Sequence, residues 1–431
     1  MSVKDNRADV SEKKEDDGAS ASKSKKSSSL FTWALALFGT AVGAGILFLP
    51  ISAGSFGFWP LVIMTVLIGP IVFFFHRTYS RIISVSGETG KDILETVAHL
   101  TGRKRGLLVA VLYWFSIYPT VLIYGVSVTN TANSFIVNQL NGPEIARPLI
   151  AVACVGVLTA VFTFGKKTVL KVSNALVYPL VISLAAVSVY LIPRWDFASF
   201  RSFEPDTSIV AGVLLMLPVL IFSMSHMAAI SQLVLDMQRD HADDLDKRVS
   251  QVDLVAVAML VSFTMIFTWS CALAMGAEGL MEADAENLPV LPYFANVTDT
   301  PFMAYLAPIV TLCAIATSYF GHMLGTEESF RYMFRAFAPD TAEKVKPQTM
   351  SYAIYAFVFV TATAVAILNP SVLDMISIIG GLILAFIVGM LPFLVFATTK
   401  HMRKYARKPE TILVFCIGVI LAGTTIWDLL T

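Results

Sequence analysis

The chain has 431 residues, of which 56% are hydrophobic and 14% are charged, and its formal net charge at pH 7 is zero. A water-soluble globular protein could not cover so large an apolar fraction, so the composition predicts an all-α integral membrane protein. Its basic loops require no nucleic-acid partner. Its four cysteines lie in apolar segments, without a CxxC pair or the spacing of metal ligands.

Residues 1–29 mix both charges with serine and lack apolar periodicity, which predicts a disordered cytoplasmic tail. The first apolar segment after it is too long and too rich in glycine to be a removed signal peptide, so we expect it to remain in the mature protein. A bilayer core takes about 20 apolar residues per helix. On that basis the sequence predicts eleven transmembrane helices, at 31–52, 57–83, 107–138, 148–164, 169–192, 208–235, 251–275, 302–326, 349–368, 371–397 and 409–430.

The orientation follows from lysine and arginine, which are retained on the cytoplasmic side of a membrane. If the tail is inside, 28 of the 31 basic residues fall on the cytoplasmic side, and the outside holds only Arg147, Arg194 and Arg201. One miscounted span would reverse every later loop, so this asymmetry supports eleven spans. We expect a cytoplasmic amino terminus and a carboxyl terminus outside.

Two of the predicted spans look interrupted. The first contains LFGTAVGAGILFLP, from Leu37 to Pro50, with three glycines within seven residues. The sixth contains MLPVLIFSMSHMAAISQLV, from Met216 to Val234, with a proline, two serines and a histidine at mid-membrane depth. Two interrupted spans that lie five helices apart are typical of a secondary transporter built from inverted repeats.

The predicted division of the chain follows from this spacing, because a five-helix unit enters the membrane from opposite faces in its two copies. We expect residues 30–200 to form the first five-helix repeat and residues 201–400 the second. Residues 401–431 would add a cytoplasmic loop and the eleventh transmembrane helix.

Unwinding of the first span near Thr40–Gly45 would serve a binding site in two ways. Freed N–H groups, together with the positive end of the outer half-helix, can hold a carboxylate. Freed carbonyls can coordinate a cation, and glycine lets a ligand approach the main chain. The alternative is close helix packing, because Gly39 and Gly43 also form a GxxxG motif.

Seven segments resemble one family, in order along the chain after residue 30: GTAVGAGILFLPI, FFFHRTYSR, YGVSVTNT, FSMSH, NLPVLPYFAN, FGHMLGTEE and NPSVLDMI. They are similar to the hydroxy and aromatic amino-acid permeases of bacteria and, within them, to the serine and threonine transporter branch. The resemblance implies the five-plus-five inverted-repeat fold of the amino-acid, polyamine and organocation superfamily. It also implies ion-coupled import of an amino acid across the bacterial inner membrane, without a cofactor.

The predicted substrate is a small neutral amino acid, serine- or threonine-like, and proton-coupled import of an aromatic amino acid is the alternative. We expect its carboxylate at the break of the first span and its ammonium at freed carbonyls of the sixth. The resemblance adds an aromatic residue of the third span that closes over the substrate. The predicted substrate-binding residues are Thr40, Gly43, Ala44, Gly45, Tyr124, Phe222, Ser223, Ser225 and His226.

The sequence departs from the serine branch at this site. That branch has an asparagine before the histidine of the sixth span and Ser-Pro after it. Here Ser225 precedes His226, and Met227 and Ala228 follow it. The side chains around the substrate therefore differ from those of the serine branch.

Three histidines fall within predicted spans, where ionisable groups are costly and tend to be functional. His76 is followed by Arg77 near the cytoplasmic end of the second span, so an interfacial, structural role is expected. His226 fits a substrate-site or proton-linked role and also a plain hydrogen-bonding role. His322 fits an inner gate and also a cap for the polar residues one turn later.

The coupling ion is predicted from the eighth span. Thr317 stands where the serine branch carries a lysine, and with Ser318 it provides two hydroxyls, which are hard oxygen ligands suited to an alkali cation. Resemblance to sodium-coupled members of the wider superfamily implies a sodium site formed by Gly39, Val42, Ala314, Thr317 and Ser318. Two alternatives stay open: the hydroxyls bond only to the preceding turn, or a proton is coupled through His226.

Two other classes of membrane protein, enzymes and channels, have sequence patterns of their own. An enzyme needs a nucleophile beside a base, or clustered metal ligands, and a channel needs a ring of filter carbonyls or charges. The sequence has neither pattern. It therefore predicts a transporter, not an enzyme, whose partners are an amino acid and the lipid bilayer, with a channel as the remaining alternative.

Overall fold

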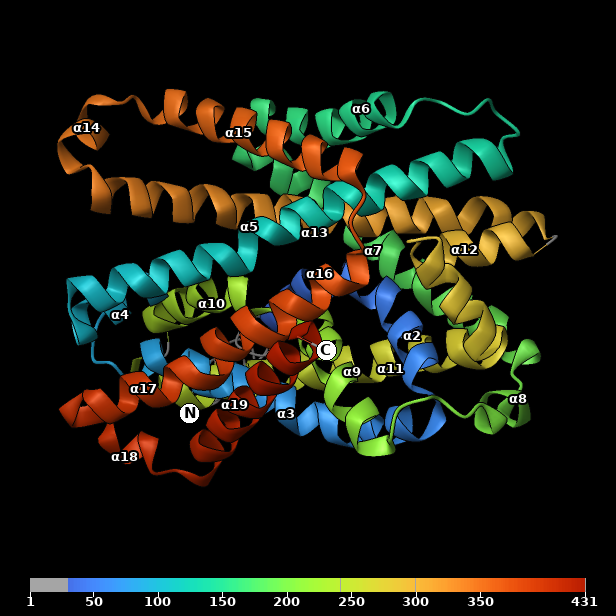
Figure 1. The fold of residues 1–431 in the computed structure, drawn as a ribbon. Coiled ribbons are helices and arrows are strands. Elements are labelled where there is room, and N and C mark those ends of the chain that lie inside the picture. Colours follow the sequence, from blue (N-terminus) through green and yellow to red (C-terminus); the bar gives the residue numbers. More distant parts are fainter. Residues whose placement is uncertain (1–29, 241, 299, 431) are drawn as a thin grey trace, which may run out of the picture.

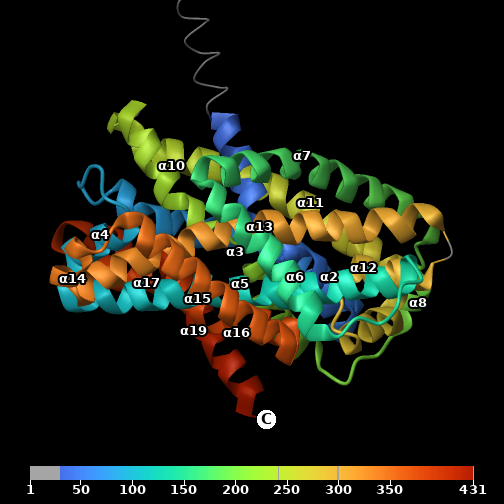
Figure 2. The ribbon, with the colours of Figure 1, turned by 90° about the horizontal axis from the view of Figure 1, so that it is seen from above.

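The computed structural model describes residues 30–240, 242–298 and 300–430, and every regular element within these ranges is a helix. The tail predicted for residues 1–29 lies outside the described residues. Figures 1 and 2 show long helices that cross one another in a single bundle.

The first half of the chain starts with a helix over Leu30–Ala41. It continues with α2 (Ala44–Phe56), α3 (Phe58–Ser84), α4 (Ile93–Thr101), α5 (Arg103–Ser134), a π-helical turn (Phe135–Gln139), α6 (Arg147–Ala160), α7 (Lys166–Leu191) and α8 (Phe197–Ser202).

The second half of the chain is also helical throughout its described residues. It contains α9 (Ile209–Ser223), α10 (Met227–Asp240), α11 (Leu245–Ala285), α12 (Val290–Val297), α13 (Pro301–Phe337), α14 (Pro339–Lys344), α15 (Pro347–Leu368), α16 (Val372–Ile378), a π-helix (Ile379–Met390), α17 (Leu391–Thr398), α18 (Arg403–Ala406) and α19 (Pro409–Leu430).

Nine helices of the described chain are long and apolar enough to cross a membrane, and the number reaches eleven when each of two bent helix pairs counts as one span. The predicted all-α membrane protein is thereby confirmed. Each of the eleven predicted segments overlaps one of these helices or bent pairs. The seventh and eighth run beyond the predicted ends, because α11 covers Leu245–Ala285 and α13 covers Pro301–Phe337.

The helices form two groups that meet along the centre of the bundle. In Figure 1, α6 and α15 lie along the top and α5 and α13 cross beneath them, and these four helices contact one another. The second group contains α2, α3, α9 and α11, in which α2 and α3 contact each other and both of the other helices. The bent helix pairs belong to the second group and face α5 and α13 of the first.

The predicted interruptions of the first and sixth spans are confirmed. Leu30–Ala41 and the helix that follows it meet at 59°, and α9 and α10 meet at 48°. Gly45, just after the first break, contacts the end of α9 so closely that a Cβ there would lie 3.0 Å from the Cα of Ser223. The two breaks therefore lie against each other.

The tenth span is not the continuous α-helix that the sequence suggested. Its central part, Ile379–Met390, is a π-helix. A Cβ on Gly380 would lie 2.1 Å from the carbonyl oxygen of Pro218, and one on Gly381 would lie 1.9 Å from Thr425 Oγ1. The π-helical segment thus packs directly onto the backbone of α9, just before the break of the sixth span.

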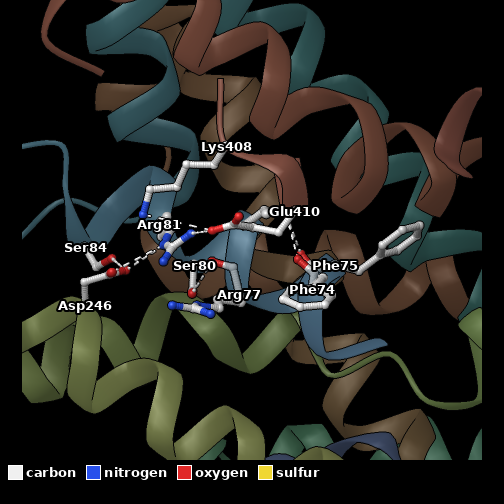
Figure 3. A network of polar contacts seen from close by, with 10 residues as sticks. Phe74, Phe75, Arg77, Ser80, Arg81, Ser84, Asp246, Lys408 and Glu410 are labelled. Carbon is white, nitrogen blue, oxygen red and sulfur yellow. Dashed lines mark hydrogen bonds and ion pairs between the residues drawn. The ribbon is translucent and has the colours of Figure 1, made fainter. Parts of the chain in front are cut away.

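A buried arginine joins three helices near one end of the bundle (Figure 3). Arg81 of α3 is 1% exposed, and its Nε donates to Asp246 at 3.2 Å while its Nη1 donates to Glu410 at 2.9 Å. Asp246 lies at the start of α11 and Glu410 at the start of α19. Hydrogen bonds satisfy this charge inside the protein, and they fix α19 to the helices around the breaks.

Candidate functional site

A small polar cavity of about 30 Å³ lies between the two breaks. It is bounded by the first span, by α5, by both halves of the sixth span, and by one residue each of α13 and the tenth span. Six of the nine predicted substrate-binding residues line it: Thr40, Gly45, Tyr124, Phe222, Ser223 and Ser225. Sequence analysis missed the hydroxyls of Ser116 and Thr120, which α5 adds to the same cavity.

The other three predicted residues are placed differently. Gly43 is the residue before α2, with an extended backbone, and a Cβ there would lie 1.8 Å from Ser318 Oγ. Ala44 is the first residue of α2. His226 does not line the cavity, because its ring is turned away toward α11.

The need for glycine at position 43 comes from this contact and not from a backbone angle. Its φ of −153° is one that any residue adopts, yet α13 approaches so closely that no side chain fits. Gly39 is packed too, since a Cβ there would lie 3.2 Å from Val177 of α7. The structure therefore shows close packing at both glycines, as the alternative interpretation expected, in addition to the break of the helix.

The start of α2 has the features of an anion site. The first turn of a helix leaves its N–H groups without partners in that helix, and its dipole is positive there. Gly43 provides no side-chain cap, and the first turn of α2 carries no acidic residue. Gly45, in that first turn, lines the cavity. A carboxylate in the cavity could thus accept hydrogen bonds from this turn.

Hydroxyl groups provide further polar contacts in the cavity. Ser223 Oγ is buried and has no hydrogen-bond partner among the described residues. Thr120 Oγ1 donates to the carbonyl of Ser116 at 3.0 Å and keeps its lone pairs. The cavity therefore offers at least one hydroxyl that a polar ligand could satisfy.

An aromatic pair closes one side of the cavity. Tyr124 is 3% exposed and meets the ring of His322 edge to face, with centroids 5.3 Å apart. His322 Nδ1 donates to the carbonyl of Ser318 at 3.0 Å, so this histidine satisfies a carbonyl of its own helix and also lines the cavity. Glu327 bonds elsewhere, to Arg331 and Tyr355.

The residues predicted to hold sodium lie beside this cavity. Gly39, Thr317 and Ser318 line a second cavity of about 360 Å³, which shares Thr40 and His322 with the first. Val42 and Ala314 are buried and are not among the residues lining it. Thr317 Oγ1 donates to the carbonyl of Ala314 at 3.0 Å, as expected for a threonine bonded to the preceding turn.

Behind the break of the sixth span lies a buried cluster of ionisable groups. His226 Nε2 is 2.8 Å from Asp253 Oδ1, and both side chains are 0% exposed. The ring of His226 stacks on that of His76, with centroids 3.7 Å apart. The backbone N–H of His226 donates to His76 Nε2 at 3.2 Å. His76 is 1% exposed, so it faces the protein interior, and its bond to the backbone of His226 agrees with the structural part of the expected role.

Asp253 was missed by sequence analysis, which considered only the histidines among the intramembrane groups. A signal was present, since QVDLVAVAML holds a single carboxylate at the start of the seventh apolar span. Such a residue is a functional candidate in its own right. Its partner could not be inferred, because His226 lies 27 residues away and on another span.

Near the carboxyl end of α5, a polar network joins four segments. Asn130 donates to the carbonyl of Asn287 at 2.8 Å and to Asn369 Oδ1 at 3.1 Å, and it accepts from Arg147 Nη2 at 2.7 Å. Asn287 and Asn369 both have a φ of 53°, a left-handed conformation that asparagine tolerates better than most residues. The network holds α5, α6 and the loops after α11 and α15 together.

Two bent helix pairs that face each other around a polar cavity, within a bundle of apolar spans, are typical of a membrane transporter. Comparison with known proteins agrees, since the tryptophan/tyrosine permease family matches residues 26–426. The chain belongs to this family, and a permease is not an enzyme.

The curated relatives cover nearly the whole chain. The serine transporter SdaC of Escherichia coli K12 is 34% identical over 403 residues, which are 92% of this chain and 94% of the relative. The threonine/serine transporter TdcC of Escherichia fergusonii is 32% identical over 418 residues, with the same coverage. That of Yersinia enterocolitica is 31% identical over 421 residues, or 93% and 95% of the two chains.

We predict that Gly43→Ala lowers the melting temperature of the purified protein in detergent. The added methyl group would overlap Ser318 Oγ, and overpacking of this kind typically costs about 1–3 kcal/mol. When Ser318 is also replaced by glycine, Gly43→Ala should not lower the melting temperature in this way. Gly423→Ala on α19 is the control, because a Cβ there meets nothing within 4 Å. An unchanged melting temperature of Gly43→Ala would contradict the close contact of the first span with α13.

Proposed function

We propose that the chain imports a small neutral amino acid, serine- or threonine-like, across the bacterial inner membrane by cation symport with alternating access. The observation that carries the proposal is the polar cavity between the breaks of the first and sixth spans. The printed names of the relatives, serine transporter and threonine/serine transporter, support this substrate class.

The proposed binding mode uses the backbone for the amino-acid group and hydroxyls for the side chain. The carboxylate accepts from N–H groups at the start of α2, near Gly45. The ammonium meets carbonyls freed in the break at Ser225, and the substrate hydroxyl pairs with Ser223 Oγ. A cavity of about 30 Å³ has to enlarge to admit a substrate. The smaller the substrate, the less the bent helices need to move, which favours serine over an aromatic amino acid.

For alternating access we propose the five-plus-five inverted repeat. The two bent pairs are the first and sixth of the eleven spans, as this repeat requires. Placement of 28 of the 31 basic residues on one side supports a cytoplasmic amino terminus and an outer carboxyl terminus. The second cavity, beside the helix that starts at Leu30, would then lie toward the cytoplasm. The asparagine network around Asn130 would close the outer side.

We propose sodium as a coupling ion, with Gly39, Val42, Ala314, Thr317 and Ser318 as its ligands. Support comes from the burial of both hydroxyls, each residue being 5% exposed, and from the contact of Ser318 Oγ with the break at Gly43. A hydroxyl that donates to a carbonyl, as Thr317 does, keeps lone pairs for a cation. A cation here would join the first span to α13.

The sodium proposal predicts that Thr317→Ala weakens sodium-driven transport. In proteoliposomes at fixed pH, an inward sodium gradient should raise the uptake of labelled serine by the unchanged protein and raise it much less for the variant. Thr398→Ala is the control, because Thr398 also bonds to its preceding turn but is an exposed residue at the end of α17. Equal uptake in sodium and choline media would rule out the sodium site.

The substrate proposal predicts that Ser223→Ala weakens serine binding without lowering the melting temperature. The change removes a buried hydroxyl that has no partner among the described residues, and the loss of one hydrogen bond to substrate costs about 1 kcal/mol, or roughly fivefold in affinity. Ser52→Ala is the matched control, because Ser52 Oγ is equally buried and unpartnered but does not line the cavity.

The measurement is scintillation proximity binding of labelled serine to the purified protein, with competition by serine, threonine, alanine, tryptophan and tyrosine. The matching family is named after tryptophan and tyrosine, so an aromatic amino acid is the second candidate substrate. Competition by tryptophan alone would establish that candidate. Equal serine affinity of the Ser223→Ala and Ser52→Ala variants would show that the substrate binds outside this cavity.

A further inference from the structure

We infer that His226 and Asp253 together form an occluded proton-binding site, which is linked to the break of the sixth span and is separate from the cation ligands on α13. The inference rests on the proposed transport function, and it concerns a group of residues that lies outside the substrate cavity. It is drawn from the hydrogen bonds of three buried side chains on three segments.

His76 is fixed as a neutral ring by its two hydrogen bonds. Its Nδ1 faces the carbonyl of Val72 at 2.9 Å, and because a carbonyl only accepts, Nδ1 carries the proton. Its Nε2 accepts from the backbone N–H of His226 at 3.2 Å. His76 cannot take a second proton without losing that bond, so it does not exchange protons in this arrangement.

His226 is different, because only one of its ring nitrogens is fixed by the backbone. Its Nδ1 donates to the carbonyl of Met224 at 3.3 Å. Its Nε2 faces Asp253 Oδ1 at 2.8 Å, a distance that requires one proton between the two atoms. The pair is then neutral overall, either as imidazole with carboxylic acid or as imidazolium with carboxylate.

Removal of the shared proton would leave one negative charge in a fully buried site. Asp253 Oδ2 has no hydrogen-bond partner among the described residues, so the charge would be poorly compensated. Two groups of α3 act on Asp253: His76, and Arg77, whose positive charge favours the carboxylate but whose Nε makes no hydrogen bond to it. Asp236 of α10 is bonded to Trp33, and α2 has no ionisable side chain. The closed arrangement therefore favours the proton-loaded pair.

Loss of the proton would also change the break itself. With a single ring proton left, His226 could donate either to Asp253 or to the carbonyl of Met224, but not to both. Donation to the carboxylate would free the Met224 carbonyl, which lies one residue before Ser225 of the substrate cavity. Proton occupancy and the shape of the substrate-binding break are thereby linked.

Both side chains are 0% exposed, so a proton bound between them can exchange with water only after the surrounding helices move. This is the behaviour needed of a transported ion: uptake when the site opens to one side, and release when it opens to the other. The step involves no redox change, since the proton moves from water on one side to water on the other.

Asp253→Asn tests the inference, because the asparagine Nδ2 can donate to His226 Nε2 and so imitates the proton-loaded pair without being able to release a proton. The experiment uses the full chain in proteoliposomes with equal sodium on both sides and an imposed pH gradient, acidic outside. The unchanged protein should accumulate labelled serine, by up to about tenfold per pH unit for one proton per substrate. The variant should show an accumulation ratio near one, while serine counterflow persists.

Glu278→Gln is the control, since Glu278 lies on the same helix, α11, as an exposed residue away from the buried pair. We expect it to retain pH-driven accumulation per folded transporter. A pH-sensitive dye inside the vesicles adds a direct reading: serine entry should acidify the lumen for the unchanged protein and for Glu278→Gln, but not for Asp253→Asn.

Three outcomes would overturn the inference. If Asp253→Asn accumulates serine along a pH gradient as well as the unchanged protein does, the proton is not bound at this pair. If a sodium gradient drives uptake by the unchanged protein and a pH gradient does not, the inference fails while the proposed function stands. If the unchanged protein shows no serine counterflow, the proposed function fails and the inference fails with it.

Discussion

The constraint on which the structure depends is the satisfaction of backbone polar groups at two points where helices are interrupted inside an apolar bundle. An N–H or C=O group without a partner costs several kcal/mol in such surroundings. The breaks at Gly43 and at Ser225 therefore exist only because other groups surround them. Hydroxyls of α5 and α13 lie on one side, and the buried histidines and Asp253 lie on the other.

Close packing and polar contacts act together at these breaks. Gly43 lies against the side chain of Ser318, and Gly45 lies against the ring of Phe222 and the backbone of Ser223, so the first span packs closely on both α13 and the sixth span. The π-helix of the tenth span packs in the same way onto Pro218. If one break moves as the proposed transport cycle requires, we expect the other break and α13 to move with it, because interfaces packed this tightly do not deform continuously.

The sequence was informative where a rule acts along the chain and uninformative where distant segments meet. Apolar segments of about 20 residues gave the spans, and glycine and serine clusters gave the breaks at Gly43 and Ser225. The partner of His226, the burial of His76 and the role of Arg81 depend on contacts between different spans, which periodicity does not contain. The π-helix at Gly380 packs on Pro218 of another span, and the local sequence pattern contains no such contact.

The central claim is that the two breaks hold one amino acid by its backbone groups. An experimental structure of the protein with bound L-serine tests it most directly. We predict the carboxylate of serine within hydrogen-bond distance of the N–H groups that follow Gly43, and its hydroxyl beside Ser223. Serine bound only in the polar network around Asn130 and Arg147, with the cavity between the breaks still closed, would contradict the account.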